Sequence, residues 1–119
     1  MMAGNGDPAR LLDAAQRLLA SDRPDLREEG FRALDVAATR GLPTAQLALG
    51  KMHDPRYWRE GSPLPHASAL VAAAYYSRAV RGGATDARGE LESLCGRMRA
   101  GIEGLDTESR DRAVTQYCN

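Results

Sequence analysis

The sequence has little charge imbalance and almost no lysine. Of its 16 basic residues only Lys51 is a lysine, and 16 acidic residues bring the formal net charge to zero. The balance also holds locally, with nine charges of each sign in residues 1–60 and seven of each in residues 61–119. Without a basic surplus the chain lacks the long-range field that attracts nucleic acids or anionic membranes. We therefore expect no nucleic-acid role.

Cysteines and long apolar runs are also scarce. Cys95 and Cys118 are too few for a disulfide framework and lack the paired spacing of a zinc site, so we predict reduced thiols, one of them buried. The longest uncharged run, residues 61–77, contains prolines and serines and is shorter than the ~20 apolar residues that cross a bilayer. The first residues show no charged leader before an apolar run. If the chain is not a fragment of a longer protein, we expect a cytoplasmic location without membrane insertion.

One pattern occurs twice in the chain, with a separation of 42 residues. Residues 37–49 read AATRGLPTAQLAL, and residues 79–91 read AVRGGATDARGEL. Alanine, glycine, alanine and leucine recur at steps of four, as Ala37, Gly41, Ala45 and Leu49 and then as Ala79, Gly83, Ala87 and Leu91. Repetition at a fixed period is typical of stacked helix pairs, because one pair cannot bury its apolar face without a neighbour.

Apolar periodicity predicts helices throughout and no strand of any length. The predicted helices cover residues 7–20, 23–40, 43–53, 67–80, 85–100 and 106–118, with Asp7, Asp22, Thr85 and Asp106 as N-terminal caps. The length suits one domain, residues 1–119, with a modest core. We predict an all-α fold, a short α-solenoid of five to six helices in antiparallel pairs. Its repeat-like core is residues 31–94, between capping helices 7–20 and 106–118.

Gly50 lies inside the third predicted helix. Glycine there costs ~1 kcal/mol relative to alanine, so we expect another helix to approach closely at this point. The alternative is that the helix ends at Gly50.

The spacing of alanines and glycines resembles the Sel-one-like repeat family, relatives of the tetratricopeptide repeats. The matching residues in the first copy are those at steps of four together with Gly50, and the second copy adds Tyr75 and Tyr76. The resemblance covers residues 31–94, and the period is longer than is usual in that family because extra residues lie in the 54–65 loop. It implies a protein-binding module, such as an adaptor, scaffold or co-chaperone, of the kind often found in bacterial signalling or secretion systems.

The 54–65 loop, DPRYWREGSPLP, is the strongest candidate for partner binding. Tyr57 and Trp58 are adjacent aromatic residues flanked by Arg56 and Arg59, and these residue types most often dominate interface energy. The alternative is that Trp58 folds back over the helices that the loop joins. Tyr76 aligns with Leu34 and should be core, whereas Tyr75 is a candidate for lining a groove.

Other residues allow a different class of function. His53 and His66 stand near the two ends of the loop, and with Cys95 they could serve a metal-binding or small-ligand sensor or an enzyme. Their spacing matches no zinc signature, and Cys95 lies on an apolar helix face where a thiol is usually inert. We therefore expect no metal and no cofactor.

The sequence thus predicts a non-enzymatic module that binds a protein or peptide partner through its inter-helix groove and the 54–65 loop. A dedicated chaperone or immunity partner of a bacterial secreted protein is a related hypothesis. A homo-oligomeric scaffold stays open as well, because a short array exposes apolar faces at its ends.

Overall fold

The computed structural model describes residues 7–101 and 104–118 of the chain. Within that part there are six helices and no strand. The helices are α2 (Pro8–Leu19), α3 (Pro24–Thr39), α4 (Pro43–His53), α5 (Ala69–Arg81), α6 (Ala87–Arg99) and α7 (Thr107–Tyr117). The predicted all-α class is therefore confirmed.

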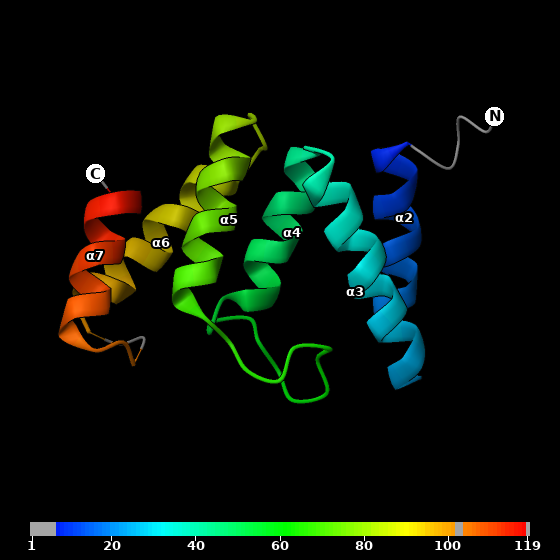
Figure 1. The fold of residues 1–119 in the computed structure, drawn as a ribbon, viewed down its shortest axis with the longest axis horizontal. Coiled ribbons are helices and arrows are strands. Elements are labelled where there is room, and N and C mark those ends of the chain that lie inside the picture. The colour runs from blue at the N-terminus through cyan, green and yellow to red at the C-terminus, as the bar shows by residue number, and fades with distance from the viewer. Residues whose placement is uncertain (1–6, 102–103, 119) are drawn as a thin grey trace.

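The helices follow one another along the long axis of a body of 48 × 30 × 19 Å, from α2 at one end to α7 at the other (Figure 1). Each helix packs mainly against its neighbours in sequence, and α7 also contacts α5. This stepwise packing is solenoid-like. The loop that joins α4 to α5 lies at the lower edge of the view in Figure 1.

The apolar interior is divided into two clusters rather than gathered into one core. The buried residues of the cluster among α2, α3 and α4 are Ala15, Leu34, Ala37, Ala38, Ala45 and Leu49. The buried residues of the cluster among α5, α6 and α7 are Ala69, Ala72, Ala73, Tyr76, Leu94, Cys95, Met98 and Ala113. Because most of these side chains are small, the helices can approach one another closely.

The two copies of the sequence pattern form the same helix corner. Gly41 and Gly83 have φ angles of 93° and 85°, in the left-handed region that favours glycine. The Leu42 amide donates to the Ala37 carbonyl at 3.2 Å, and the Ala84 amide donates to the Ala79 carbonyl at 2.9 Å. Each glycine therefore ends its helix with the long backbone bond of a Schellman motif.

Several predicted helix starts agree with the structure. The Asp7 carboxylate accepts a hydrogen bond from the Ala9 amide at 3.0 Å, and Pro8 begins α2. The Asp106 carboxylate accepts one from the Ser109 amide at 3.2 Å, which caps α7. These side chains satisfy backbone amides that have no partner inside the helix.

Two predicted caps are wrong. Arg23, not Asp22, occupies the cap position of α3, and the helix begins with Pro24. Thr85 does not cap α6, because Asp86, with a φ of 74°, stands directly before the first helical residue.

The start of α5 is also displaced from its predicted position, from residue 67 to Ala69. The Ser68 hydroxyl accepts from the Val71 amide at 3.2 Å, and the Ser68 amide donates to the His53 carbonyl at 2.7 Å. The second of these bonds joins the beginning of α5 to the end of α4.

Gly50 lies within α4, and the close helix approach expected there is confirmed. A Cβ atom on Gly50 would lie 2.4 Å from Cδ1 of Tyr76, a fully buried residue of α5. The bare glycine backbone therefore lets the Tyr76 ring lie directly on α4. This contact brings Tyr76, of the second apolar cluster, against the helix that carries Leu49 of the first.

We expect Gly50→Ala to destabilise the protein by about 2 kcal/mol, because overpacking this contact outweighs the better helix propensity of alanine. Gly96→Ala is the matched control, since a Cβ on Gly96 in α6 meets no atom within 4 Å. The control should be neutral or more stable by up to ~1 kcal/mol. Urea unfolding of both variants measures the difference, and equal stability would contradict the steric explanation.

Candidate functional site

The candidate site is built on residues 54–68, the segment between α4 and α5, which contains the 54–65 loop. Its first residue, Asp54, follows α4 directly and is fully buried. The Asp54 carboxylate accepts hydrogen bonds from the Tyr76 hydroxyl at 2.7 Å, from the Arg97 guanidinium at 2.9 and 3.1 Å, and from the Arg56 amide at 3.0 Å. One carboxylate therefore joins the end of α4 to α5, α6 and the loop.

The charge of Asp54 is stabilised by these donors. Burial by itself would raise the pKa of the Asp54 carboxyl, but the hydrogen bonds from Arg97, the Arg56 amide and Tyr76 together outweigh it and hold the pKa below its ordinary value. Burial, reinforced by the bond to Asp54, raises the pKa of the Tyr76 hydroxyl far above its usual range. At neutral pH the pair is thus a carboxylate and a neutral phenol.

Arg97 is the partner that sequence reasoning did not identify. It is one of several charged residues in α6, so its sequence context indicates a solvated side chain. The structure instead leaves its side chain only 19% exposed and places it against Asp54. The signal for this position is its spacing of three residues from the buried Leu94, which puts both on one side of the helix.

Tyr57 is directed toward α6. Its hydroxyl donates to the Glu90 carboxylate, with oxygen–oxygen distances of 2.8 and 3.0 Å, and this bond raises the pKa of Tyr57. The Tyr57 ring also lies 5.3 Å from the Arg56 guanidinium and 5.7 Å from Lys51 Nζ, within the range of cation–π attraction. Arg56 in turn donates to the Ser93 hydroxyl at 3.2 Å. The front half of the loop is therefore held on α6.

Trp58 and the rear half of the loop are held differently. The Trp58 indole Nε1 donates to the Leu64 carbonyl at 3.0 Å, so the loop folds on itself around a half-buried ring. Arg27 of α3 donates to the Gly61 carbonyl at 3.2 Å and to the Ser21 carbonyl at 2.9 Å. Arg27, which the sequence analysis did not single out, thereby fixes the loop to the α2–α3 turn.

Between the loop and the helices lies an open pocket of about 700 Å³. The loop contributes Tyr57, Trp58 and Arg59 to its lining, and the helices contribute apolar and basic side chains. The whole lining is Leu19, Arg27, Lys51, Met52, Tyr57, Trp58, Arg59, Glu60, Gly61, Ser62 and Pro63. Apolar walls with a few charged groups are typical of a binding site.

The other predicted site residues lie outside this pocket. Arg56 lines a neighbouring cleft of about 370 Å³. The Tyr75 ring stacks on His53, with centroids 5.8 Å apart, and the Arg78 guanidinium lies 5.3 Å from it. Burial lowers the pKa of His53, and Asp35 partly opposes that shift. The structure thus brings together Tyr57, Trp58 and Arg59 at one pocket and separates them from Tyr75.

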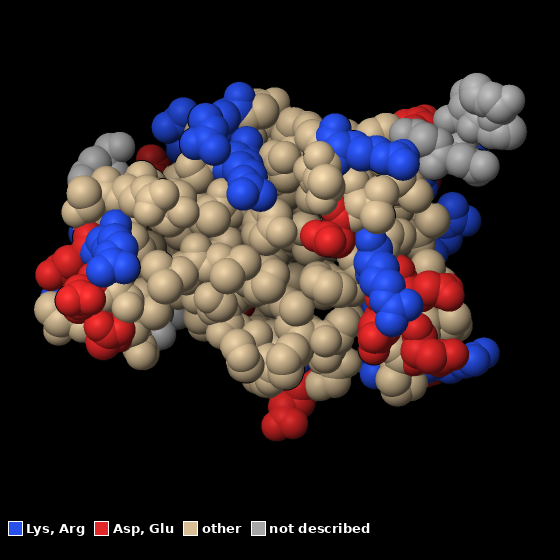
Figure 2. Space-filling view, in the orientation of Figure 1, with Lys and Arg blue, Asp and Glu red and all other residues tan. Residues whose placement is uncertain are grey.

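Charged side chains are unevenly spread over the face drawn in Figure 2. They gather over α2 and α3, over α7, and at the upper end of α5, while the middle of this face carries few of them. The large apolar residues that are exposed in the described part of the chain are Val36, Leu70 and Val71.

The structure bears on the hypothesis of a metal-binding or nucleophilic site at His53, His66 and Cys95. The Asp54 carboxylate beside His53 is already occupied by three donors. In residues 7–101 and 104–118 no group of three or more histidine, cysteine or acidic side chains is placed to hold a metal ion. Cys95 is not a thiol, so it offers no nucleophile.

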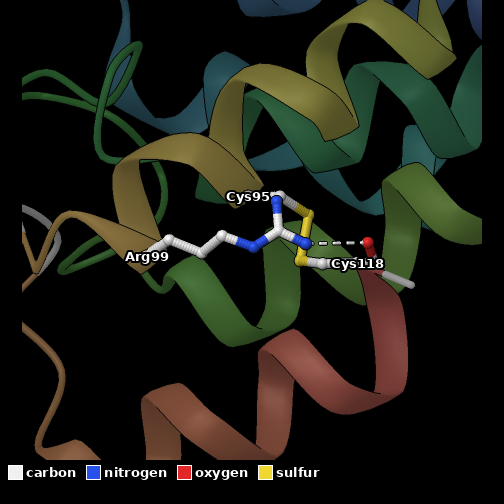
Figure 3. Close-up of a disulfide and its surroundings, with 3 residues drawn as sticks. All are labelled: Cys95, Arg99 and Cys118. Carbon is white, nitrogen blue, oxygen red and sulfur yellow. Dashed lines mark hydrogen bonds between the residues drawn. A yellow bond between two sulfur atoms is a disulfide. The ribbon is translucent and has the colours of Figure 1, made fainter.

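The prediction of two reduced thiols is wrong. Cys95 and Cys118 form a disulfide between α6 and the residue that follows α7, with their Cα atoms 5.7 Å apart (Figure 3). The two cysteines are separated by 23 positions in sequence, and no periodic pattern relates them. Only the packing of α7 against α6 brings their side chains together, and rules based on sequence spacing do not predict such a contact.

The chain was compared with known proteins, and no family model, curated protein or solved structure matches it. Within the described residues, no helix is both long enough and apolar enough to cross a membrane.

We expect Asp54→Ala to destabilise the protein by about 3 kcal/mol, because it leaves Arg97 and the Tyr76 hydroxyl without their shared partner. Asp25→Ala is the control, since Asp25 pairs with Arg23 on the surface at 2.8 Å and should change stability by at most ~0.5 kcal/mol. Chemical denaturation of both variants tests the contrast.

The pH dependence of stability provides an independent test of Asp54. Because its pKa is lowered on folding, its contribution is complete above the pKa of an ordinary aspartate, about 4, and is lost below that as the pH falls through the lowered pKa of the folded state. Asp54→Asn should therefore flatten the fall in stability of the wild-type protein between neutral and acid pH. Parallel curves for the two proteins would show that the Asp54 charge contributes nothing.

Proposed function

We propose that this chain is a non-enzymatic module that binds a protein or peptide partner at the pocket between the 54–65 loop and helices α2, α3 and α4. The observation that carries the proposal is the pocket itself. It combines a half-buried Trp58, the Tyr57 ring and the Met52 side chain with basic groups, in a space of about 700 Å³. Such a space accommodates one or two side chains of a partner, which is the usual scale of an interface anchor.

The charges around the pocket favour an acidic partner segment. Arg27, Lys51 and Arg59 line it, against the single carboxylate of Glu60. Lys51 Nζ is 3.8 Å from Glu90 and its side chain is 43% exposed, so it can still meet an incoming carboxylate. We infer a partner segment with an apolar or aromatic anchor flanked by aspartate or glutamate. Charge complementarity of this kind governs orientation and association rate.

The loop is suited to this role because it is positioned before any partner arrives. Tyr57, Trp58 and Gly61 are each hydrogen bonded to a different place in the protein, on α6, within the loop and on α3. A loop that is already ordered loses less conformational entropy on binding than a free one.

We also propose that the chain is a Sel-one-like repeat protein. The spacing of alanines and glycines supports this, and so do the matching hydrogen bonds at the Gly41 and Gly83 corners. This assignment favours a protein-interaction role over the sensor or enzyme that the histidines suggested.

The disulfide argues against the predicted cytoplasmic location. Disulfides persist in oxidising compartments and are rare where thiols are kept reduced. The bond between Cys95 and Cys118 therefore supports surroundings that are oxidising for at least part of the life of the protein.

Trp58 is the only tryptophan, so its fluorescence reports directly on the pocket. Peptides selected from a random displayed library should contain an apolar anchor next to acidic residues, and their titration should change the emission of Trp58. Arg59→Glu should weaken binding at least about tenfold, since it replaces an attraction by a repulsion at the pocket rim. Added salt should weaken binding as well.

The matched control is Arg81→Glu, the same charge reversal on an exposed residue at the end of α5, outside the pocket lining. It should leave the affinity within about twofold. Circular dichroism should show the same thermal midpoint for both variants. Selection of basic or purely polar peptides, or equal effects of the two reversals, would contradict the proposed site.

A further inference from the structure

The disulfide adds a covalent link between α6 and the C-terminal end of α7, besides the main chain that precedes α7. Cys118 directly follows α7, while Cys95 is in the middle of α6. The bond therefore connects the far end of the last helix to the neighbouring pair. Its role depends on how firmly α7 is held by its other contacts.

Few apolar side chains attach α7 to the rest of the protein. Ala113 is its one fully buried residue, and Val114 and Tyr117 are only partly buried against the second apolar cluster. Its pair Glu108–Arg112, at 3.3 Å, lies within the helix, and both side chains are more than 70% exposed. Such exposed pairs contribute little to docking. The disulfide is therefore a major restraint on the position of α7.

A reductant can reach this bond. Cys95 is 3% exposed, but Cys118 is only half-buried, and both line a surface cleft of about 310 Å³. The cleft is also lined by Arg88, Arg99 and Tyr117. Cys118 is therefore the more accessible of the two cysteines and the expected point of attack.

A basic side chain lines the same cleft as the disulfide. Arg99 is four residues after Cys95 on α6, and Figure 3 shows its guanidinium lying next to the disulfide. Its Nη2 donates to the Cys118 carbonyl at 3.0 Å, which holds the group in place. A nearby cation stabilises a thiolate, and a more stable leaving thiolate speeds thiol–disulfide exchange.

We propose that Cys95–Cys118 is a redox-active exchange site for dithiol reductants, and that opening it releases α7 from the α5–α6 pair. A thiolate of the dithiol attacks Sγ of Cys118, the bond between the cysteines breaks, and Cys95, four residues before Arg99 on α6, leaves as a thiolate. The second thiolate of the reductant then attacks the reductant sulfur that is bonded to Cys118, which frees Cys118. The protein gains two electrons and two protons, and the reductant leaves as its disulfide.

Release of α7 uncovers the end of the second apolar cluster, where Leu94 and Met98 of α6 are buried in the closed state. The pocket at the 54–65 loop is lined by residues of α2, α3, α4 and the loop, and by none of α7. The exchange site is therefore independent of the proposed peptide site.

The experiment treats the full-length protein with dithiothreitol without denaturant. Alkylation and mass spectrometry count free thiols, and hydrogen exchange follows the helices. We expect two alkylated cysteines, with loss of amide protection in residues 107–117 and retained protection in residues 43–53 and 69–81. Reduction that requires denaturant would overturn the proposal. So would unchanged protection of residues 107–117 in the reduced protein, because the bond would then be only a structural link.

Two sets of variants test the parts separately. Cys95→Ser with Cys118→Ser should show an unprotected α7 with or without reductant, and loss of protection in residues 69–81 as well would overturn release of α7 alone. Arg99→Gln should slow reduction about threefold for each unit by which the pKa of the Cys95 thiol rises. Arg99→Lys should restore the rate, and Arg88→Gln in the same cleft is the control. Equal reduction rates for Arg99→Gln and Arg88→Gln would contradict the proposed effect of Arg99 on the leaving thiolate.

Discussion

The structure depends on one buried carboxylate. Asp54 ends α4 and accepts bonds from Tyr76 of α5, Arg97 of α6 and the amide of Arg56 in the loop. Asp54 and the nearby Gly50–Tyr76 contact both join α4, which carries part of the first apolar cluster, to α5, which carries part of the second. A buried charge with several donors tolerates few alternative arrangements, which fixes how the helix pairs meet.

The same arrangement determines where the candidate pocket lies. Since the loop begins at Asp54, its first residues are directed toward α6, and Tyr57 reaches Glu90. The chain then returns toward α3, where Arg27 holds the Gly61 carbonyl. The pocket is the space enclosed by this path, with Trp58 as one wall. Its shape thus follows from structural contacts, while its apolar and basic lining supports the proposed partner binding.

Sequence reasoning succeeded where the signal was local. The glycine corners, the Asp7 and Asp106 caps and the six helices follow from backbone preferences and apolar spacing, which act over a few residues. Of the predicted site residues, the structure brings Tyr57, Trp58 and Arg59 to a single pocket, whereas Tyr75 stacks on His53 elsewhere. Peptide binding there stays a prediction. The caps of α3 and α6 were wrong because neighbouring residues compete for the cap within a turn of the chain.

By itself, the sequence determined the all-helical class and the repeated corner, because steric and hydrogen-bonding rules along one helix are enough for each. It also predicted a close approach at Gly50, but not that Tyr76 makes it. Only the tertiary structure decided the contacts between residues far apart in the chain. Arg97 meets Asp54 across 43 positions, and Cys118 meets Cys95 across 23. Neither pair has a periodic signature, since each depends on how whole helices cross. For that reason two cysteines that look like inert thiols became the covalent link of the last helix.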